Sequence, residues 1–250
     1  MIKFIVANWK LHPVTAQEAE TLFKSVLGGV KGVKNVDVAV CPPAIFLPLL
    51  NQIKAKKIVL GAQNLFWEEK GAYTGEISGP MLRQFGCRYA IVGHSERKQY
   101  FYETDETINL KLKAAFKAGL KAVLCAGESD RGASEKEVAQ ILETQIQNAL
   151  AGIPKGRLAD LTIAYEPVWA IGTGLTVSPD DALKAKLFIK KVLMNLYDRP
   201  SAERVRILYG GSVNSKNIFD FVQILDGALV GGASVDAAEF VKIVKIASLA

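Results

Sequence analysis

Short apolar stretches rich in β-branched residues recur along the whole chain, and they constrain its fold more than any other feature. Eight such stretches are present: residues 3–8, 36–41, 58–63, 89–93, 121–126, 161–165, 205–209 and 228–230. They are nearly continuously hydrophobic rather than alternating, which is typical of strands that are buried on both faces of a parallel sheet. The sequence therefore predicts eight parallel strands.

Segments with helical periodicity and helix-start signals separate these strands. Residues 15–18 and 134–137 have the pattern of a capping box, and Ser178-Pro179 places a proline at the first position of a helix. A stripe that would pack a helix onto the sheet follows Thr15: Ala19, Leu22, Phe23, Val26 and Leu27. Eight strand–helix units in 250 residues predict an α/β fold, a single (β/α)8 TIM barrel domain over residues 1–250, rather than a doubly wound sheet.

Polar residues and glycines gather where the predicted strands end. In a (β/α)8 barrel the catalytic groups lie at the C-terminal ends of the strands, and phosphate commonly binds near the last two loops. The residues at these ends are Asn8, Lys10, Gln63, Asn64, His94, Ser95, Glu96, Gly127, Glu128, Glu166, Gly210, Gly211, Ser212, Gly231 and Gly232. The sequence thus predicts a rim that carries a cation, an imidazole, a carboxylate and glycine-rich turns.

The glycine-rich turns are candidate phosphate ligands. Residues 210–212 and 231–232 leave backbone N–H groups uncovered, and the second pair precedes Ala233-Ser234, a candidate helix start that favours an anion. Tight turns that need glycine would explain either pair alone. Their place after the seventh and eighth strands favours the phosphate interpretation.

Three side chains are candidates for acid–base or electrostatic work. Glu166 precedes Pro167, which holds it extended at the rim as a candidate general base; the alternative is an ordinary loop glutamate. His94 is one of two histidines and could hydrogen-bond a carbonyl or have only a structural role. Lys10 could stabilise an oxyanion, form a Schiff base or simply lie at the surface, and the residues alone leave these alternatives open.

Two loops have unusual compositions. Residues 168–178 are uncharged and contain Gly172 and Gly174, which indicates a lid that closes over a ligand; a static loop is the alternative. Residues 65–78 are too apolar for a free loop, with three aromatic side chains. We expect them to bury against a partner subunit or against the barrel itself.

Composition argues against several classes of protein and site. The net charge of +6 is interspersed along the sequence, which does not favour nucleic acid, and the longest uncharged stretch, residues 38–53, contains three prolines and is too short to span a membrane. The N-terminal residues do not have the pattern of a signal peptide, so we expect a cytoplasmic protein. Three dispersed cysteines and two histidines predict no metal site.

Three rival motifs each lack a required residue. Residues 172–177 lack the third glycine of a dinucleotide fingerprint, residues 127–134 lack the lysine of a P-loop, and residues 93–97 lack the second glycine of a nucleophile elbow. We therefore expect no nucleotide cofactor and no serine-hydrolase chemistry.

The rim motifs together resemble the triosephosphate isomerase family. The segments that carry the resemblance are residues 7–10, 61–64, 71–78, 93–97, 164–174, 208–214 and 226–234. It implies an aldose–ketose isomerase that interconverts dihydroxyacetone phosphate and D-glyceraldehyde 3-phosphate through an enediolate, in glycolysis and gluconeogenesis. It also implies a homodimer that needs no cofactor or metal and whose partner molecule is a small phosphorylated triose.

The resemblance also implies roles for individual residues. Glu166 would move the carbon-bound proton, neutral His94 would polarise the carbonyl, Lys10 and Asn8 would stabilise the enediolate, and Glu96 would orient the site; this acid–base assignment is already established for the family. The residues that would hold the phosphate are Gly172, Ser212, Gly231 and Gly232. The 65–78 loop would reach the neighbouring subunit through Thr74 at its tip.

Two positions depart from the family pattern. His12-Pro13 replaces the usual Asn-Gly after the lysine, and Lys98 stands where a second arginine is common. The second departure bears on a supporting ion pair, because lysine lacks the bidentate fork of arginine. Two rival functions are a lyase-type barrel with Lys10 as a Schiff-base nucleophile and a phosphate-binding barrel without catalysis.

Overall fold

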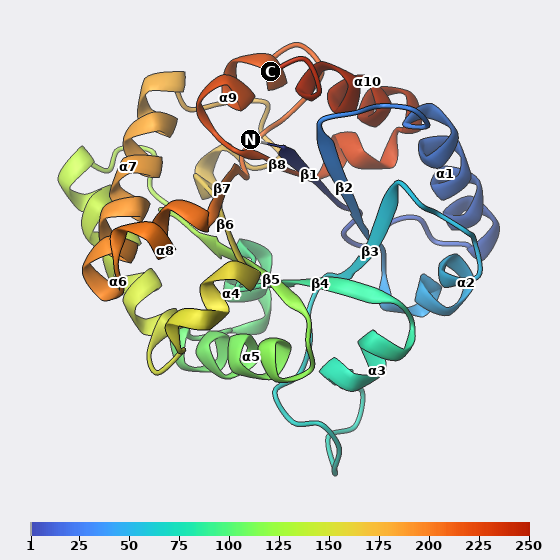
Figure 1. The fold of residues 1–250 in the computed structure, drawn as a ribbon, viewed down its shortest axis with the longest axis horizontal. Helices are drawn as coiled ribbons and strands as arrows, with labels where there is room; N and C mark the ends of the chain where they lie inside the picture. Colours follow the sequence, from blue (N-terminus) through green and yellow to red (C-terminus); the bar gives the residue numbers. More distant parts are fainter. Residues whose placement is uncertain (1) are drawn as a thin grey trace.

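The eight predicted strands form a closed parallel barrel (Figure 1). A computed structural model describes residues 2–250. The strands are β1 Lys3–Asn8, β2 Val36–Cys41, β3 Ile58–Ala62, β4 Cys87–Val92, β5 Lys121–Ala126, β6 Leu161–Tyr165, β7 Arg206–Tyr209 and β8 Gly227–Val230. Each strand pairs in parallel with its neighbours in sequence, and β1 also pairs with β8. The predicted (β/α)8 fold of one domain is confirmed.

Helices surround the barrel on its outside (Figure 1). The α-helices are α1 Ala16–Gly29, α2 Leu47–Asn51, α3 Gly79–Gln84, α4 Ser95–Phe101, α5 Asp105–Lys117, α6 Glu135–Leu150, α7 Pro179–Leu196, α8 Arg199–Arg204, α9 Ile218–Ile224 and α10 Ala237–Ala247. Short 3-10 helices are η1 Ala44–Phe46, η2 Lys155–Asp160, η3 Val168–Ala170 and η4 Gly232–Val235. Within residues 2–250, every helix is too short or too polar to cross a membrane.

The predicted helix starts are present. Thr15 Oγ1 accepts a hydrogen bond from the backbone N–H of Glu18, whose carboxylate accepts one from the N–H of Thr15, and the same reciprocal pair joins Ser134 to Glu137. Ser178 caps α7, with proline as the first helical residue. These side chains satisfy N–H groups that have no acceptor within the helix.

Both faces of the strands are buried, which explains their continuous hydrophobicity. In β1, Phe4 and Val6 belong to a cluster inside the barrel, while Ile5 and Ala7 pack in the outer layer beneath the helices. Every second residue of a strand faces inward, and the last inward-facing residues of β1, β6, β7 and β8 are Val6, Ala164, Leu208 and Leu229. Two residues further along the chain are the rim residues Asn8, Glu166, Gly210 and Gly231. The alternation of the strands therefore directs these residues toward the mouth of the barrel.

The segment between β3 and α3, residues 65–78, projects away from the barrel (Figure 1). Its base is closed by a hydrogen bond from the backbone N–H of Phe66 to the carbonyl of Ile77, at 2.8 Å. The ring of Phe66 contacts the rings of Trp67 and Tyr73. Residues 68–76 are exposed, so the tip of this loop does not lie against its own barrel.

Candidate active site

A cavity of about 240 Å³ opens at the C-terminal rim of the barrel. The residues that line it are Asn8, Lys10, His94, Glu166, Ile171, Gly172, Gly174, Gly210, Gly211, Ser212, Val213, Asn214, Leu229, Gly231, Gly232 and Ala233. Every predicted catalytic or substrate-binding residue except Glu96 is among them. Strands β1, β4, β6, β7 and β8 therefore bring together residues that are up to 225 positions apart in sequence, from Asn8 to Ala233.

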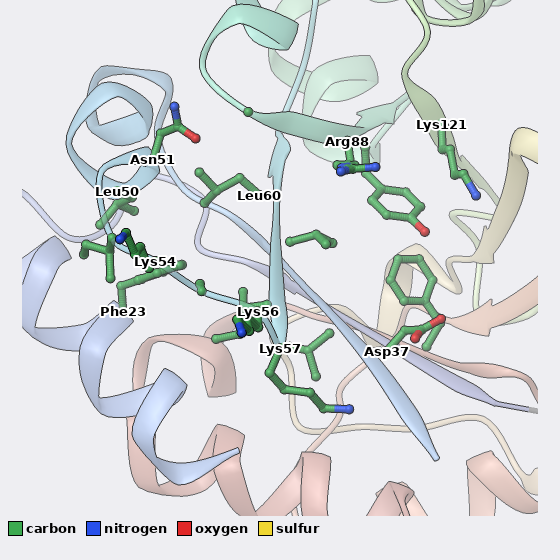
Figure 2. A pocket seen from close by; sticks show the side chains of 18 of the residues that line it. Phe23, Asp37, Leu50, Asn51, Lys54, Lys56, Lys57, Leu60, Arg88 and Lys121 are labelled. Carbon is green, nitrogen blue, oxygen red and sulfur yellow. The ribbon is translucent and has the colours of Figure 1, made fainter. Parts of the chain in front are cut away.

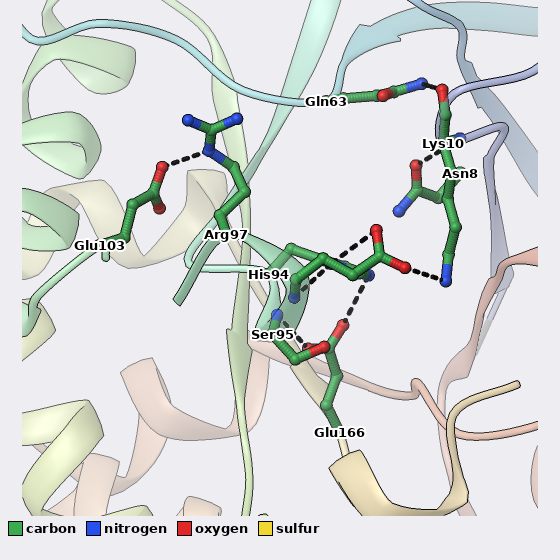
Figure 3. Close-up of polar contacts among 9 residues, drawn as sticks. Asn8, Lys10, Gln63, His94, Ser95, Arg97, Glu103 and Glu166 are labelled. Atoms are coloured by element: carbon green, nitrogen blue, oxygen red, sulfur yellow. Dashed lines mark hydrogen bonds and ion pairs between the residues drawn. The ribbon is translucent and has the colours of Figure 1, made fainter. Parts of the chain in front are cut away.

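Glu166 is a buried carboxylate with one oxygen engaged and one free. Its Oε2 accepts a hydrogen bond from the backbone N–H of Ser95 at 3.0 Å, whereas Oε1 has no hydrogen-bond partner among the described residues. Oε1 lies 3.5 Å from His94 Nε2, and the side chain of Glu166 is only 2% exposed (Figure 3). Among the described residues no donor occupies the lone pairs of Oε1, so this oxygen can accept a hydrogen bond or a proton from a molecule in the cavity.

His94 lies at the N-terminus of α4, where the hydrogen bond to its ring fixes the tautomer. The backbone N–H of Glu96 donates to His94 Nδ1 at 3.2 Å, so in the neutral imidazole the proton is on Nε2. That nitrogen points toward Glu166 (Figure 3). The ring can therefore donate a hydrogen bond from Nε2 into the cavity without carrying a charge.

Lys10 is held in the cavity by its backbone and by an ion pair. Its Nζ lies 2.5 Å from Glu96 Oε1, and its backbone has a left-handed conformation, with φ of 54°. The amide of Gln63 donates to the carbonyls of both Lys10 and Cys41, at 2.9 Å each, and Asn8 Oδ1 accepts from the N–H of Lys10. These bonds hold a conformation that is strained in residues other than glycine.

Two glycines make room for the buried carboxylate. A Cβ at Gly127 would lie 1.9 Å from the carbonyl oxygen of Glu166, and a Cβ at Gly210 would lie 2.8 Å from its Cγ. Beneath this carboxylate lies Cys125, and burial, followed by the charge of Glu166, raises the pKa of its thiol well above the ordinary value. Cys125 therefore stays a neutral thiol beside this carboxylate.

The glycine-rich turns after β7 and β8 line the cavity, and their backbone N–H groups are candidate donors to an anion. Within residues 2–250, no acceptor is found for the N–H groups of Gly211 and Ser212. Gly232 is the first residue of η4, so its N–H has no acceptor within that helix. The predicted helix start at Ala233-Ser234 is in fact this four-residue 3-10 turn, and the longer helix α10 begins only at Ala237. Free N–H groups from two adjacent turns form a site that suits a phosphate.

The segment that follows β6 lies over the cavity and is attached to the β7 loop. Ser212 Oγ donates to the carbonyl of Ala170 at 2.6 Å and accepts from the N–H of Gly174 at 3.3 Å. The N–H of Val177 donates to the hydroxyl of Tyr209 at 3.4 Å. The side chain of Ser212 therefore holds this segment, and the backbone N–H of Ser212 can bind a ligand.

The root of the same segment is anchored by a buried carboxylate. Glu128 Oε1 accepts from Trp169 Nε1 at 3.0 Å and from the hydroxyl of Tyr165 at 3.1 Å. Burial raises the pKa of Glu128 above its ordinary value, and its other oxygen lacks a hydrogen-bond partner among the described residues. The first residues of the segment form η3 rather than an irregular loop.

The structure also shows supporting residues to which the sequence pattern assigned no role. Gln63 is the clearest, because its amide holds the strained Lys10. The carboxylate of Glu103 contacts Arg97 Nε (Figure 3). The same carboxylate also contacts the buried Nζ of Lys111. Lys98, the departure from the family pattern, forms no ion pair within residues 2–250, so Arg97 makes the supporting contact. Only the place of Gln63 at a strand end could have indicated its function.

Comparison with known proteins is consistent with this geometry over nearly the whole chain. The sequence model of the family described as triosephosphate isomerase matches residues 3–247. The triosephosphate isomerase of Endomicrobium trichonymphae is 48% identical over 244 residues, which cover 96% of this chain and 97% of that protein. The enzymes of Carboxydothermus hydrogenoformans, 46% identical with 97% of each chain covered, and Moorella thermoacetica, 48% identical with 96% of each covered, carry the same name.

Proposed function

Because the chain belongs to the triosephosphate isomerase family, we propose that the rim cavity carries out its isomerisation with Glu166 as the base. The chain is an isomerase that interconverts dihydroxyacetone phosphate and D-glyceraldehyde 3-phosphate, a reaction of glycolysis and gluconeogenesis. This reaction moves a proton between two adjacent carbons. It needs one base, one hydrogen-bond donor at the carbonyl and a place for the phosphate.

Glu166 is proposed to take the proton from the substrate carbon through Oε1. The observation that carries this assignment is that Oε1 is buried, has no hydrogen-bond donor among residues 2–250, and lies at the cavity 3.5 Å from His94 Nε2. The backbone N–H of Ser95 holds Oε2, which fixes the plane of the carboxylate. After the transfer, the same oxygen returns the proton to the neighbouring carbon.

His94 and Lys10 are proposed to stabilise the negative charge that develops on the substrate oxygens. The N–H from Glu96 keeps the proton on Nε2, which donates to the carbonyl oxygen as it becomes an enediolate. Lys10 supplies a fixed positive charge at the same rim, and the amide of Asn8 lines the cavity beside it. Glu96 acts through Lys10 and His94 and is a positioning residue.

The phosphate is proposed to lie against the free N–H groups of Ser212 and Gly232, beside Gly231. Gly172 would close over it from the segment after β6, which we interpret as the lid. Its backbone has φ of 72°, which a side chain rarely adopts. Apolar residues of the lid would exclude water from the enediolate.

The Schiff-base alternative is disfavoured by the ion pair at Lys10. Its Nζ lies 2.5 Å from Glu96 Oε1, and this contact would have to break before Nζ could attack a carbonyl carbon. Borohydride reduction in the presence of substrate would label Lys10 only if an imine forms.

We also propose a homodimer in the cytoplasm, whose interface includes residues 65–78. The loops after β1, β2, β3 and β4 are neighbours around the rim, because these strands are adjacent in the barrel. Besides the projecting loop, they expose large apolar side chains: Leu11, Val14, Ile45, Tyr100, Phe101 and Tyr102. An apolar surface of this kind favours burial by a second copy. Three buried free cysteines fit a reducing compartment.

Coupled turnover of dihydroxyacetone phosphate tests the assignment of the base. We expect Glu166→Ala to lower kcat by about 10²–10⁴, the usual contribution of a general base, with KM changed little. Glu143→Ala, on the exposed face of α6, is the matched control and should keep full activity. Near-normal kcat in Glu166→Ala would remove this residue from the role of base. A folded wild type that binds substrate but exchanges no carbon-bound hydrogen with solvent would indicate a binding barrel instead.

A further inference from the structure

A second cavity, larger than the active site, lies at the opposite end of the barrel (Figure 2). Its volume is about 680 Å³, and it is formed where strands β2, β3 and β4 begin, together with Asn51 at the end of α2 and residues 53–57 before β3. It shares no lining residue with the active-site cavity. The size lies within the range of small-molecule sites, and the proposed isomerase reaction does not use it.

The charged groups of this cavity are almost all positive. Its charged lining consists of five cations and one carboxylate: Lys54, Lys56, Lys57, Arg88, Lys121 and Asp37. The cations come from three separate segments, namely the approach to β3, the start of β4 and the start of β5 (Figure 2). Concentrated charge of one sign in a concave surface raises the local concentration of oppositely charged ligands.

Most of these cations have no partner within the protein. In the part of the chain that the structure describes, none of the five lies within 4.0 Å of a carboxylate, and only Lys57 has a hydrogen-bond acceptor, the carbonyl of Val36 at 2.6 Å. Other cations near the same end do have structural partners; Lys3, for example, donates to the carbonyl of Val222 at 2.5 Å. Lys54, Lys56, Arg88 and Lys121 are thus available to a ligand.

The single carboxylate does not neutralise them. Asp37 Oδ2 lies 3.1 Å from the guanidinium of Arg206, which is outside the cavity lining. The same guanidinium stacks over the ring of Phe4, at 4.2 Å from its centroid, and donates to the hydroxyl of Tyr89 at 3.3 Å. Asp37 is therefore committed to Arg206, and the charge of the five cavity cations remains uncompensated.

We propose that this cavity binds a small molecule that carries several phosphate groups, such as a nucleoside triphosphate or inorganic polyphosphate. A single phosphate would contact only part of a cluster that is drawn from three segments, whereas a chain of phosphates can reach cations on each of them. Apolar residues that are only partly buried, among them Ile53, Ala55 and Val59, also line the cavity and provide a surface for a base. A hollow in which the cations converge from three segments suits a compact ligand better than a nucleic-acid strand, which binds along an extended basic stripe.

Calorimetric titration of the full chain with tripolyphosphate, at fixed ionic strength near 0.1 M, tests the proposal. Saturating dihydroxyacetone phosphate blocks the active site, so any remaining binding belongs to another site. The cavity variant is Lys54→Gln/Lys56→Gln/Lys121→Gln, whose three lysines are exposed and lack structural partners. We expect binding of one tripolyphosphate per chain and about a tenfold loss of affinity in the cavity variant, since each exposed charge contributes a few-fold.

The control variant removes the same number of charges elsewhere. Lys136→Gln/Lys191→Gln/Lys242→Gln changes exposed lysines of α6, α7 and α10 that lie outside both cavities. We expect it to bind tripolyphosphate like the wild type, and we expect both variants to keep the wild-type kcat and KM. Activity therefore reports on the isomerase assignment, and tripolyphosphate binding reports on this cavity.

A parallel titration with ATP distinguishes a nucleoside triphosphate from inorganic polyphosphate as the ligand. Tighter binding of ATP than of tripolyphosphate would assign the apolar surface to a base, and equal affinities would assign the site to the phosphate chain alone; both support the proposal. The absence of binding with the active site blocked would overturn it. Equal losses in the cavity and control variants would also overturn it, as would binding of single-stranded RNA that tripolyphosphate does not displace.

Discussion

Gly210 determines how close the β7 turn can approach the proposed base, and Gly210→Ala tests that geometry. The added Cβ would lie 2.8 Å from Glu166 Cγ and 3.1 Å from the carbonyl oxygen of Tyr165. Two carbons are stable at about 3.5–4.0 Å, so the carboxylate must move by roughly 1 Å. Because Tyr165 O blocks the other side, the alanine cannot simply turn away.

The expected effect falls mainly on catalysis. A displacement of about 1 Å in a reacting group can cost roughly 100-fold in rate, which corresponds to about 2.7 kcal/mol of activation free energy. We expect kcat for dihydroxyacetone phosphate to fall by about that factor while KM changes little. Overpacking also lowers the free energy of unfolding, by about 1–3 kcal/mol. Gly156→Ala, where a Cβ has no atom within 4 Å, is the control and should leave kcat unchanged.

A double-mutant cycle separates displacement of the base from general damage to the site. In a Glu166→Ala background the side chain that Gly210→Ala displaces is absent, so the second substitution should cost little further rate. If Gly210→Ala lowers the residual activity of Glu166→Ala by the same 100-fold, its effect does not pass through the base. A single variant with wild-type kcat would refute the steric reasoning directly.

Three further perturbations follow from the same structure. Gln63→Ala removes the donor to the carbonyl of Lys10 and should lower kcat/KM about tenfold and stability by about 1–2 kcal/mol; unchanged steady-state kinetics would show that Lys10 holds its conformation alone. Thr74→Arg, on the exposed loop, should shift sedimentation from dimer toward monomer, and an unchanged profile contradicts that interface. Burial raises the pKa of the Glu128 carboxyl, so Glu128 keeps its proton to higher pH in the folded state than in the unfolded state. The free energy of unfolding therefore falls as the pH rises from about 4.5, the ordinary pKa, through the raised pKa of the folded state. Glu128→Gln cannot ionise and does not lose stability in this way, so its melting temperature minus that of the wild type should increase between pH 4 and pH 7. A difference in melting temperature that does not change with pH would contradict the raised pKa of Glu128.

The barrel itself could be predicted because its signals are local and repeated. The stretches 3–8, 36–41, 121–126 and 161–165 are strands with the predicted boundaries, since hydrophobic residues on both faces leave few alternatives to a buried parallel strand. The capping boxes at Thr15 and Ser134 form for a similarly local reason, because each pair of side chains acts within one turn. Closure of the barrel then brings the strand-end residues to one rim without any further signal.

The supporting contacts of the site could not be predicted in the same way. Lys10 is left-handed although it is not a glycine, and nothing in its neighbours indicates the strain. Its conformation depends on Gln63, which is 53 positions away and donates to it only once β3 is in place. The contact between Lys111 and Glu103 likewise depends on how α5 packs. Tertiary contacts of this kind override the backbone conformation that a residue prefers locally, and they produce no periodic pattern in the sequence.

The basic cavity shows that the rule used for the active site applies equally at the other end of the barrel. The ends of the strands predicted the rim, and the starts of the strands also carry a signal. Five strands have a cation at their first residue or directly beside it: Lys3, Lys57, Arg88, Lys121 and Arg206. Some of them satisfy carbonyls or a carboxylate, as Lys3 and Arg206 do. Lys54 and Lys56, taken alone, look like an ordinary solvated cluster. Only the parallel order of β3, β4 and β5 places them beside Arg88 and Lys121, so the site emerges from topology rather than from any local motif.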